Sequence, residues 1–112
     1  MMKMKLNEAP FAQIKNGEKT VELRLNDEKR STVNVGDEIK FVLATDDTQL
    51  IRARVIALHK YASFRELFEA GFLESTGFGG YTVDMACERM RAYYTAEQEQ
   101  KYGALGIEIE LI

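Results

Sequence analysis

Hydrophobic and polar residues alternate in several short segments of this chain, a pattern typical of β-strands that bury one face. The alternation is clearest near the end of the chain, where Leu and Ile at 105, 107, 109 and 111 are separated by Gly and Glu. Shorter segments rich in β-branched residues predict strands over 20–25, 39–43 and 49–61, with a turn at 46–48 and a short first strand over 4–6. We expect the last strand to be half buried and to close a small barrel.

Apolar residues at helical spacing, together with residues that favour helix ends, predict four helices. The first covers 9–16, with Pro10 in its first turn and Gly17 as its stop. The other three begin at 64, 83 and 96, and each follows a Ser or Thr that is a suitable N-cap. We expect them to end at Gly71, Tyr94 and Lys101. Strands and helices in this mixture predict an α+β protein built on a small, partly open barrel.

The stretch 17–24, GEKTVELR, places three ionisable side chains beside a predicted strand. Lys19 lies at the junction between helix and strand, and Glu22 and Arg24 share the polar face of the strand, about 7 Å apart. Arg24 would lower the pKa of a nearby Lys19, whereas Glu22 would raise it or take a proton from a substrate. The alternative interpretation is a solvated strand face that carries an ordinary Glu–Arg pair.

This stretch matches the signature G-x-K-x-x-E-x-R, and the chain thereby resembles the ASCH family of small PUA-like barrels. The resemblance continues through 35–41, VGDEIKF, similar to the family's G-D-x-I-x-F turn and strand, and through Tyr93, Tyr94 and 102–109, similar to its closing helix and strand. It covers nearly the whole chain. It implies a partly open PUA-like β-barrel of five or six mostly antiparallel strands with two to four short helices, and a role in binding RNA or modified nucleosides.

The resemblance also leaves an enzymatic alternative open. Some relatives are amidohydrolases that act on N4-acetylcytidine with the signature lysine, a threonine three positions later and a distal glutamate, and ribonuclease activity is reported in the broader family. Here the position three after Lys19 is Glu22 rather than threonine, although a glutamate is itself able to act as a base. The candidates for the distal glutamate are Glu66, Glu69 and Glu74.

Further candidate residues lie outside the signature. Arg52 and Arg54 share a strand face, where they would either bind a phosphate or carboxylate or form a solvated edge. Tyr93 and Tyr94 would either stack on a base or pack in the core. The glycine-rich segment 77–81 has neither the P-loop nor the dinucleotide-binding spacing, and we expect a flexible loop that is able to act as a lid.

Composition limits the chemistry further. A length of 112 residues predicts one domain over 1–112, and a net charge of −3 argues for a local pocket rather than a long basic surface. The only cysteine, Cys87, and the only histidine, His59, cannot form a disulfide or a Cys/His zinc site, so we predict no metal and no cofactor. Cys87 falls in an apolar stripe and is expected to be buried rather than nucleophilic. Without a signal peptide or a membrane span, the expected location is the cytoplasm.

Three functions agree with these patterns. The first is a module that binds RNA, a nucleotide or a modified nucleoside, with Lys19, Glu22 and Arg24 at the rim of a cleft. The second is a hydrolase that uses Lys19 and a glutamate on an N4-acylated cytidine or on RNA. The third is a domain that binds a protein or another small anion. The sequence leaves the oligomeric state open.

Overall fold

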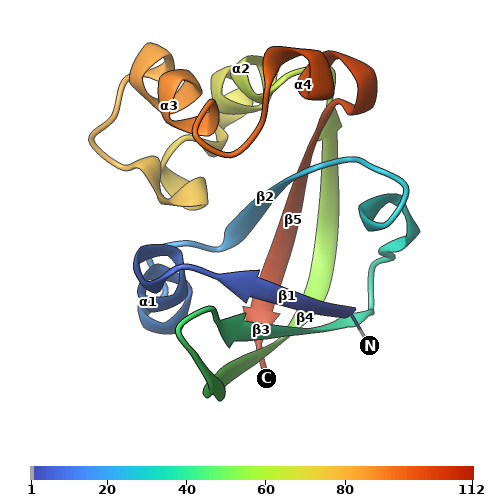
Figure 1. Ribbon diagram of the computed structural model, residues 1–112, viewed down its shortest axis with the longest axis vertical. Helices are drawn as coiled ribbons and strands as arrows, with labels where there is room; N and C mark the ends of the chain where they lie inside the picture. The colour runs from blue at the N-terminus through green and yellow to red at the C-terminus, as the bar shows by residue number, and fades with distance from the viewer. Residues whose placement is uncertain (1) are drawn as a thin grey trace.

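The computed structural model describes residues 2–112 and contains one curved sheet, with α1 (Glu8–Asn16) beside it and the other α-helices gathered at one end of it (Figure 1). The strands lie side by side in the order β1 (Met2–Leu6), β3 (Glu38–Leu43), β4 (Asp46–Tyr61), β5 (Ala104–Leu111) and β2 (Val21–Leu25). β1 and β3 are parallel, and the other three pairs are antiparallel. The predicted α+β fold is therefore confirmed, as a half-barrel of five mostly antiparallel strands.

The half-barrel remains open between its two edge strands, β1 and β2, which are not hydrogen-bonded neighbours. β5 was expected to close the barrel, but it lies inside the sheet between β4 and β2. The residues near its start are buried on both faces, because Leu105 belongs to the apolar cluster that includes α1 and Ala104 to the one that includes α2 (Phe64–Leu67) and α3 (Val83–Met90). The open seam between β1 and β2 is where the candidate site lies.

Helix α1 (Glu8–Asn16) connects the two edge strands. It ends as predicted at Gly17, whose φ of 87° lets its N–H group bond to the carbonyl oxygen of Ile14. Glycine adopts a positive φ at little cost, so the chain turns sharply here. It then enters β2 through Lys19, which lies at the predicted junction between helix and strand.

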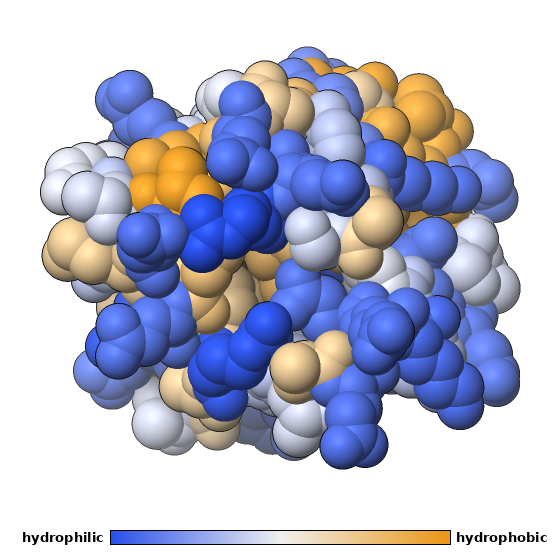
Figure 2. Space-filling view, turned by 90° about the horizontal axis from the view of Figure 1, so that it is seen from above, coloured by the Kyte–Doolittle hydropathy of each residue, from blue (hydrophilic) through white to orange (hydrophobic). Residues whose placement is uncertain are grey.

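The helical end of the molecule consists of α2 (Phe64–Leu67), the π-helical turns η2 (Phe68–Phe72) and η3 (Glu74–Phe78), α3 (Val83–Met90) and α4 (Ala96–Tyr102), while the 3₁₀ turn η1 (Arg30–Thr32) follows β2. The predicted N-caps of α2, α3 and α4 all accept the expected backbone hydrogen bond. Seen from above in Figure 2, this face is mostly hydrophilic, and its hydrophobic side chains are confined to small areas. No helix formed by residues 2–112 is long and apolar enough to cross a membrane.

Two apolar clusters fix how the sheet and the helices pack. The first joins α1 to the concave side of the sheet, and its largest fully buried members include Ile14, Phe41 and Ile107. The second joins α2, η2 and α3 to the end of β2, where Leu23 and Leu25 are buried. Because side chains alternate along a strand, Glu22 and Arg24 face away from the second cluster, toward β1 and α1.

Two local predictions were wrong. The hairpin turn between β3 and β4 lies at 44–45, and Asp46 already belongs to β4, where its side chain accepts bonds from Thr48. α3 ends at Met90 rather than at Tyr94, because the next three N–H groups bond to carbonyls three residues back and tighten the chain. The predicted loop over 77–81 starts at the end of η3, which includes Gly77 and Phe78, and continues as a turn through Gly79 and Gly80.

Candidate functional site

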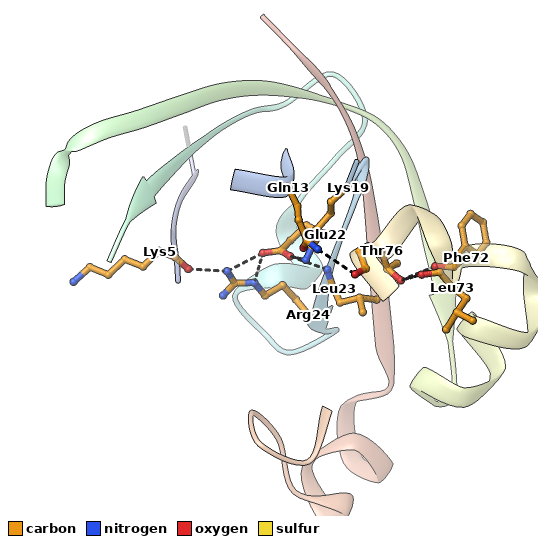
Figure 3. A network of polar contacts seen from close by, with 10 residues as sticks. Lys5, Gln13, Lys19, Glu22, Leu23, Arg24, Phe72, Leu73 and Thr76 are labelled. Carbon is orange, nitrogen blue, oxygen red and sulfur yellow. Dashed lines mark hydrogen bonds and ion pairs between the residues drawn. The ribbon is translucent and has the colours of Figure 1, made fainter. Parts of the chain in front are cut away.

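Lys19, Glu22 and Arg24 form a buried cluster of charges (Figure 3). Glu22 and Lys19 are only 3% and 8% exposed. The Glu22 Oε1 atom lies 2.8 Å from Lys19 Nζ, and Oε2 lies 3.0 Å from Arg24 Nη2 and 3.2 Å from Arg24 Nε. Glu22 and Arg24 therefore share one face of β2, as predicted, but this face is buried within the protein rather than exposed to solvent.

The Glu22 carboxylate is saturated with donors. Besides the three contacts from Lys19 and Arg24, the backbone N–H of Leu23 donates to Oε1 at 3.1 Å. A carboxylate has about four acceptor sites, so none remains for a ligand. Burial by itself would raise the pKa of Glu22, but the Lys19 and Arg24 cations outweigh it and hold this pKa below its usual range. Such a carboxylate is a weak base and a good anchor for two cations.

The groups left over for a ligand are donors. Lys19 carries three N–H groups and uses one on Glu22. Arg24 Nη2 is shared between Glu22 and the Lys5 carbonyl oxygen, 3.1 Å away, and within residues 2–112 Arg24 Nη1 has no hydrogen-bond partner. The floor of the site therefore offers N–H groups and positive charge, and it would bind a ligand through acceptor atoms.

Arg24 also crosses the seam of the half-barrel. Its guanidinium starts from β2 and reaches the carbonyl of Lys5 on β1, the opposite edge strand. A cavity of about 300 Å³ lies beside this bridge, between β1 and α1 on one side and η3 and α3 on the other. Its floor includes Lys19, Glu22 and Arg24. The open edge of the sheet is thus the position of the site.

The wall opposite β1 is formed by η3 and is held against α1. Gln13 Nε2 donates to the carbonyl oxygen of Gly77 at 3.2 Å, and the Thr20 N–H donates to the carbonyl oxygen of Ser75 at 2.9 Å. Gly77 has a φ of 93°, and a Cβ atom there would lie 2.7 Å from Gln13 Oε1 and 3.4 Å from the Lys19 side chain. The positive φ favours glycine at this position, and a larger residue would also have to displace the end of the Gln13 side chain, so Gly77 lets η3 pack closely against α1.

The cavity has an excess of positive charge and an aromatic rim. Four basic residues line the cavity, whereas Glu22 supplies the only carboxylate among the lining residues that the structure describes. The four are Lys5, Lys19, Arg24 and Arg89. This local excess contrasts with the net charge of −3 of the whole chain. Four aromatic residues also line it, namely Phe78, Tyr81, Tyr93 and Tyr94.

The two tyrosines predicted for base stacking differ in their environment. Tyr93 is 52% exposed and lines the cavity. Tyr94 also lines the cavity but stacks on Phe64, with ring centroids 5.8 Å apart, and burial raises the pKa of its hydroxyl. Tyr93 is therefore free to meet a ligand, whereas Tyr94 mainly packs against α2.

Other candidate residues lie away from the cavity. Arg52 forms a two-pronged pair with Glu38, with N–O distances of 2.8 and 3.0 Å, and Arg54 donates to the Gly36 carbonyl at 3.1 Å. Neither arginine lines the cavity, nor do the three candidate distal glutamates, Glu66, Glu69 and Glu74. Burial raises the pKa of the half-buried Cys87 thiol, which argues against a thiolate nucleophile.

The structure adds lining residues that the sequence analysis missed. They are Lys5, Gln13, Thr76 and Arg89. Thr76 is fully buried, and its hydroxyl contacts the carbonyls of Phe72 and Leu73 at 2.6 and 3.0 Å. No local pattern marks these positions, since each becomes part of the site only through the packing of β1, α1, η3 and α3 around β2. Within residues 2–112 there is no group of three or more His, Cys, Asp or Glu side chains suited to hold a metal ion.

The chain belongs to the ASCH domain family, whose model matches residues 4–112. The solved structures it resembles include the hypothetical protein PH0355, with 33% sequence identity, a TM-score of 0.87 and coverage of 99% of this chain and 98% of that chain. Protein PF0455 from Pyrococcus furiosus has 33% identity, a TM-score of 0.76 and coverage of 99% and 96%.

A more distant likeness supports the fold alone. The ASCH protein from Zymomonas mobilis has 14% identity and a TM-score of 0.58, and the aligned part covers 96% of this chain and 65% of that chain. No curated protein matches this chain. The family predicted from the signature in 17–24 is therefore confirmed, and the matched structures extend the agreement to the whole half-barrel.

Proposed function

We propose that this chain binds RNA, a nucleotide or a modified nucleoside, with one nucleoside unit in the cavity beside β2. The observation that carries the proposal is the donor-rich floor, where Glu22 is saturated and Lys19 and Arg24 keep N–H groups for a ligand. Nucleobases present carbonyl and ring-nitrogen acceptors, which suit this floor. ASCH domains as a family are generally thought to bind RNA, which agrees with this chemistry.

The size and surroundings of the cavity favour a single unit over a long strand. A volume of about 300 Å³ is at the small end of ligand pockets, which span roughly 300–1,000 Å³. Outside the cavity the chain is acidic overall and would repel an extended polyanion. The mostly hydrophilic face in Figure 2 has only small hydrophobic areas, so this face gives little support to a protein-binding function.

A hydrolase is the second candidate, and one observation favours it. Lys19, Glu22 and Thr76 line the same cavity, so it gathers a lysine, a glutamate and a threonine, the residue types that the amidohydrolases of the family use. The lowered pKa of Glu22 argues against its action as a base, and the Thr76 hydroxyl is engaged with backbone carbonyls. Binding is therefore the function that the geometry supports better.

One NMR experiment separates the two candidates. Labelled protein is titrated with the four ribonucleosides, with N4-acetylcytidine and with a single-stranded RNA tetranucleotide, while backbone amide shifts and free acetate are followed together. We expect shifts at 19–24 and at Gly77 without acetate release, and we expect Lys19→Gln to weaken binding about tenfold or more.

The control variant is Arg52→Gln, which removes a cation that does not line the cavity and should leave binding unchanged. Acetate that accumulates in the wild type and not in Lys19→Gln would establish the hydrolase instead. An absence of both shifts and turnover with every probe would contradict the proposed function. Shifts outside the cavity with none at 19–24 would refute the proposed position of the site.

A further inference from the structure

Arg89 lies in the last turn of α3 and lines the cavity, but it does not belong to the charge cluster on the floor. Its side chain is exposed, and within residues 2–112 it forms no ion pair. Two other arginines of the helical end each have a carboxylate partner: Arg65 lies 2.7 Å from Asp84, and Arg91 lies 2.6 Å from Glu99. Arg89 is therefore a cation at the cavity without a counter-charge.

The helical neighbours of Arg89 explain why it has no partner. Within α3, the positions four and three residues before Arg89 hold Met85 and Ala86, and Ala92 and Tyr93 follow beyond the end of the helix; none of the four is acidic. Tyr93, four residues later, is the exposed aromatic residue that lines the same cavity. An arginine and an aromatic ring together at the rim of a pocket suit a nucleotide, since the ring stacks on a base and the guanidinium binds phosphate oxygens.

The difference in burial between floor and rim decides where a phosphate would bind. On the floor, Glu22 neutralises one of the two positive charges of Lys19 and Arg24, and a doubly charged phosphate would have to lose most of its water to reach them. At Arg89 the charge is uncompensated and exposed, so a phosphate keeps part of its hydration there. The floor is better suited to the neutral acceptors of a base.

We propose that Arg89 binds the phosphate of the nucleotide whose nucleoside unit occupies the cavity, so that the site recognises a nucleotide and discriminates against the free nucleoside. This inference rests on the proposed function. The phosphate is either a terminal monophosphate or a phosphodiester of an RNA strand, and both present the same anionic oxygens to the guanidinium.

Calorimetric titration of the wild type, Arg89→Gln and Arg52→Gln tests this assignment. The probes are the four ribonucleosides, their 5′-monophosphates and the matching dinucleoside monophosphates. For the base that binds best, we expect the wild type to bind a phosphate-bearing ligand about tenfold more tightly than the nucleoside. In Arg89→Gln this ratio should fall to about one while nucleoside affinity stays unchanged, and in Arg52→Gln the ratio should remain that of the wild type.

The salt dependence gives a second readout. Added salt should weaken the binding of phosphate-bearing probes to the wild type more than the binding of nucleosides, and Arg89→Gln should lose most of this difference. A larger gain in affinity for the dinucleoside monophosphate assigns the contact to a phosphodiester, and a larger gain in affinity for the monophosphate assigns it to a strand end.

Equal weakening of nucleoside and nucleotide binding by Arg89→Gln, or an unchanged ratio of the two affinities, would overturn the role of Arg89. Binding of the nucleoside without any gain from phosphate would overturn it too but leave the proposed function intact, whereas binding of no probe at all would remove both.

Discussion

Replacement of Glu22 by glutamine tests whether the buried carboxylate holds the site together. The substitution keeps the shape of the side chain but removes its charge, and one end of the new amide is an N–H group that faces Lys19 or Arg24. Two cations then remain in protein surroundings without a counter-ion. Loss of one partner from a buried ion pair costs about 3–5 kcal/mol, so we expect a decrease of this size in the free energy of unfolding.

The pH dependence of this loss gives a specific signature. The folded-state pKa of Glu22 lies below its unfolded value of about 4.3, so its ionised form stabilises the fold. That contribution is fully present above pH 4.3 and is lost as the pH falls through the lower folded-state pKa. The difference in stability between the wild type and Glu22→Gln should be constant near neutral pH and should shrink below about pH 4.

Urea unfolding followed by circular dichroism at several pH values between 3 and 8, roughly the range over which carboxylates titrate, measures this difference. Glu38→Gln is the matched control, because Glu38 pairs with Arg52 on the surface, where solvent screens the charges, and its replacement should cost much less than that of Glu22. A Glu22→Gln variant as stable as the wild type at pH 7 would refute the reasoning. So would a stability difference that stays the same or grows on acidification.

Three further substitutions test the supports of the site. Gly77→Ala should destabilise the fold by about 1–3 kcal/mol and weaken ligand binding, because its Cβ atom would lie at positive φ and 2.7 Å from Gln13 Oε1. An unchanged melting temperature would contradict this role of Gly77. Glu99→Gln should cost about 1–3 kcal/mol in urea unfolding, since it removes the charge of a buried carboxylate that both pairs with Arg91 and accepts the Phe64 N–H at 2.6 Å, and a neutral outcome would contradict this role. Thr95→Ala should cost about 1 kcal/mol through loss of the capping box of α4, with no effect on ligand affinity.

The signature stretch shows how far the sequence alone leads. The stop at Gly17, the strand that follows it and the shared face of Glu22 and Arg24 were all predicted from local patterns and are confirmed. Local patterns left open whether that face meets solvent. The answer depends on α1 and η3, which cover Lys19 and Glu22 through contacts such as that between Gln13 and Gly77. Such contacts join residues far apart in the sequence and leave no periodic signal.

The arginines show that the sequence alone does not reveal which cations are available to a ligand. Arg52 and Arg54 looked like anion-binding residues because two cations share a strand face, yet each finds a nearby acceptor in Glu38 or the Gly36 carbonyl. Arg89, which has no such acceptor, carries no distinguishing sequence pattern. Whether a cation is free for a ligand depends on its three-dimensional neighbours, and these follow from the register of β3 with β4 and from the packing of α3.

A crystal structure of the protein with the ligand that binds most tightly tests the central claim most directly. The account predicts acceptor atoms of the ligand within about 3 Å of Lys19 Nζ and Arg24 Nη1, and a Glu22 carboxylate that keeps its bonds to Lys19, Leu23 and Arg24. A ligand that donates a hydrogen bond to a displaced Glu22 carboxylate, or one bound outside the cavity beside β2, would contradict it.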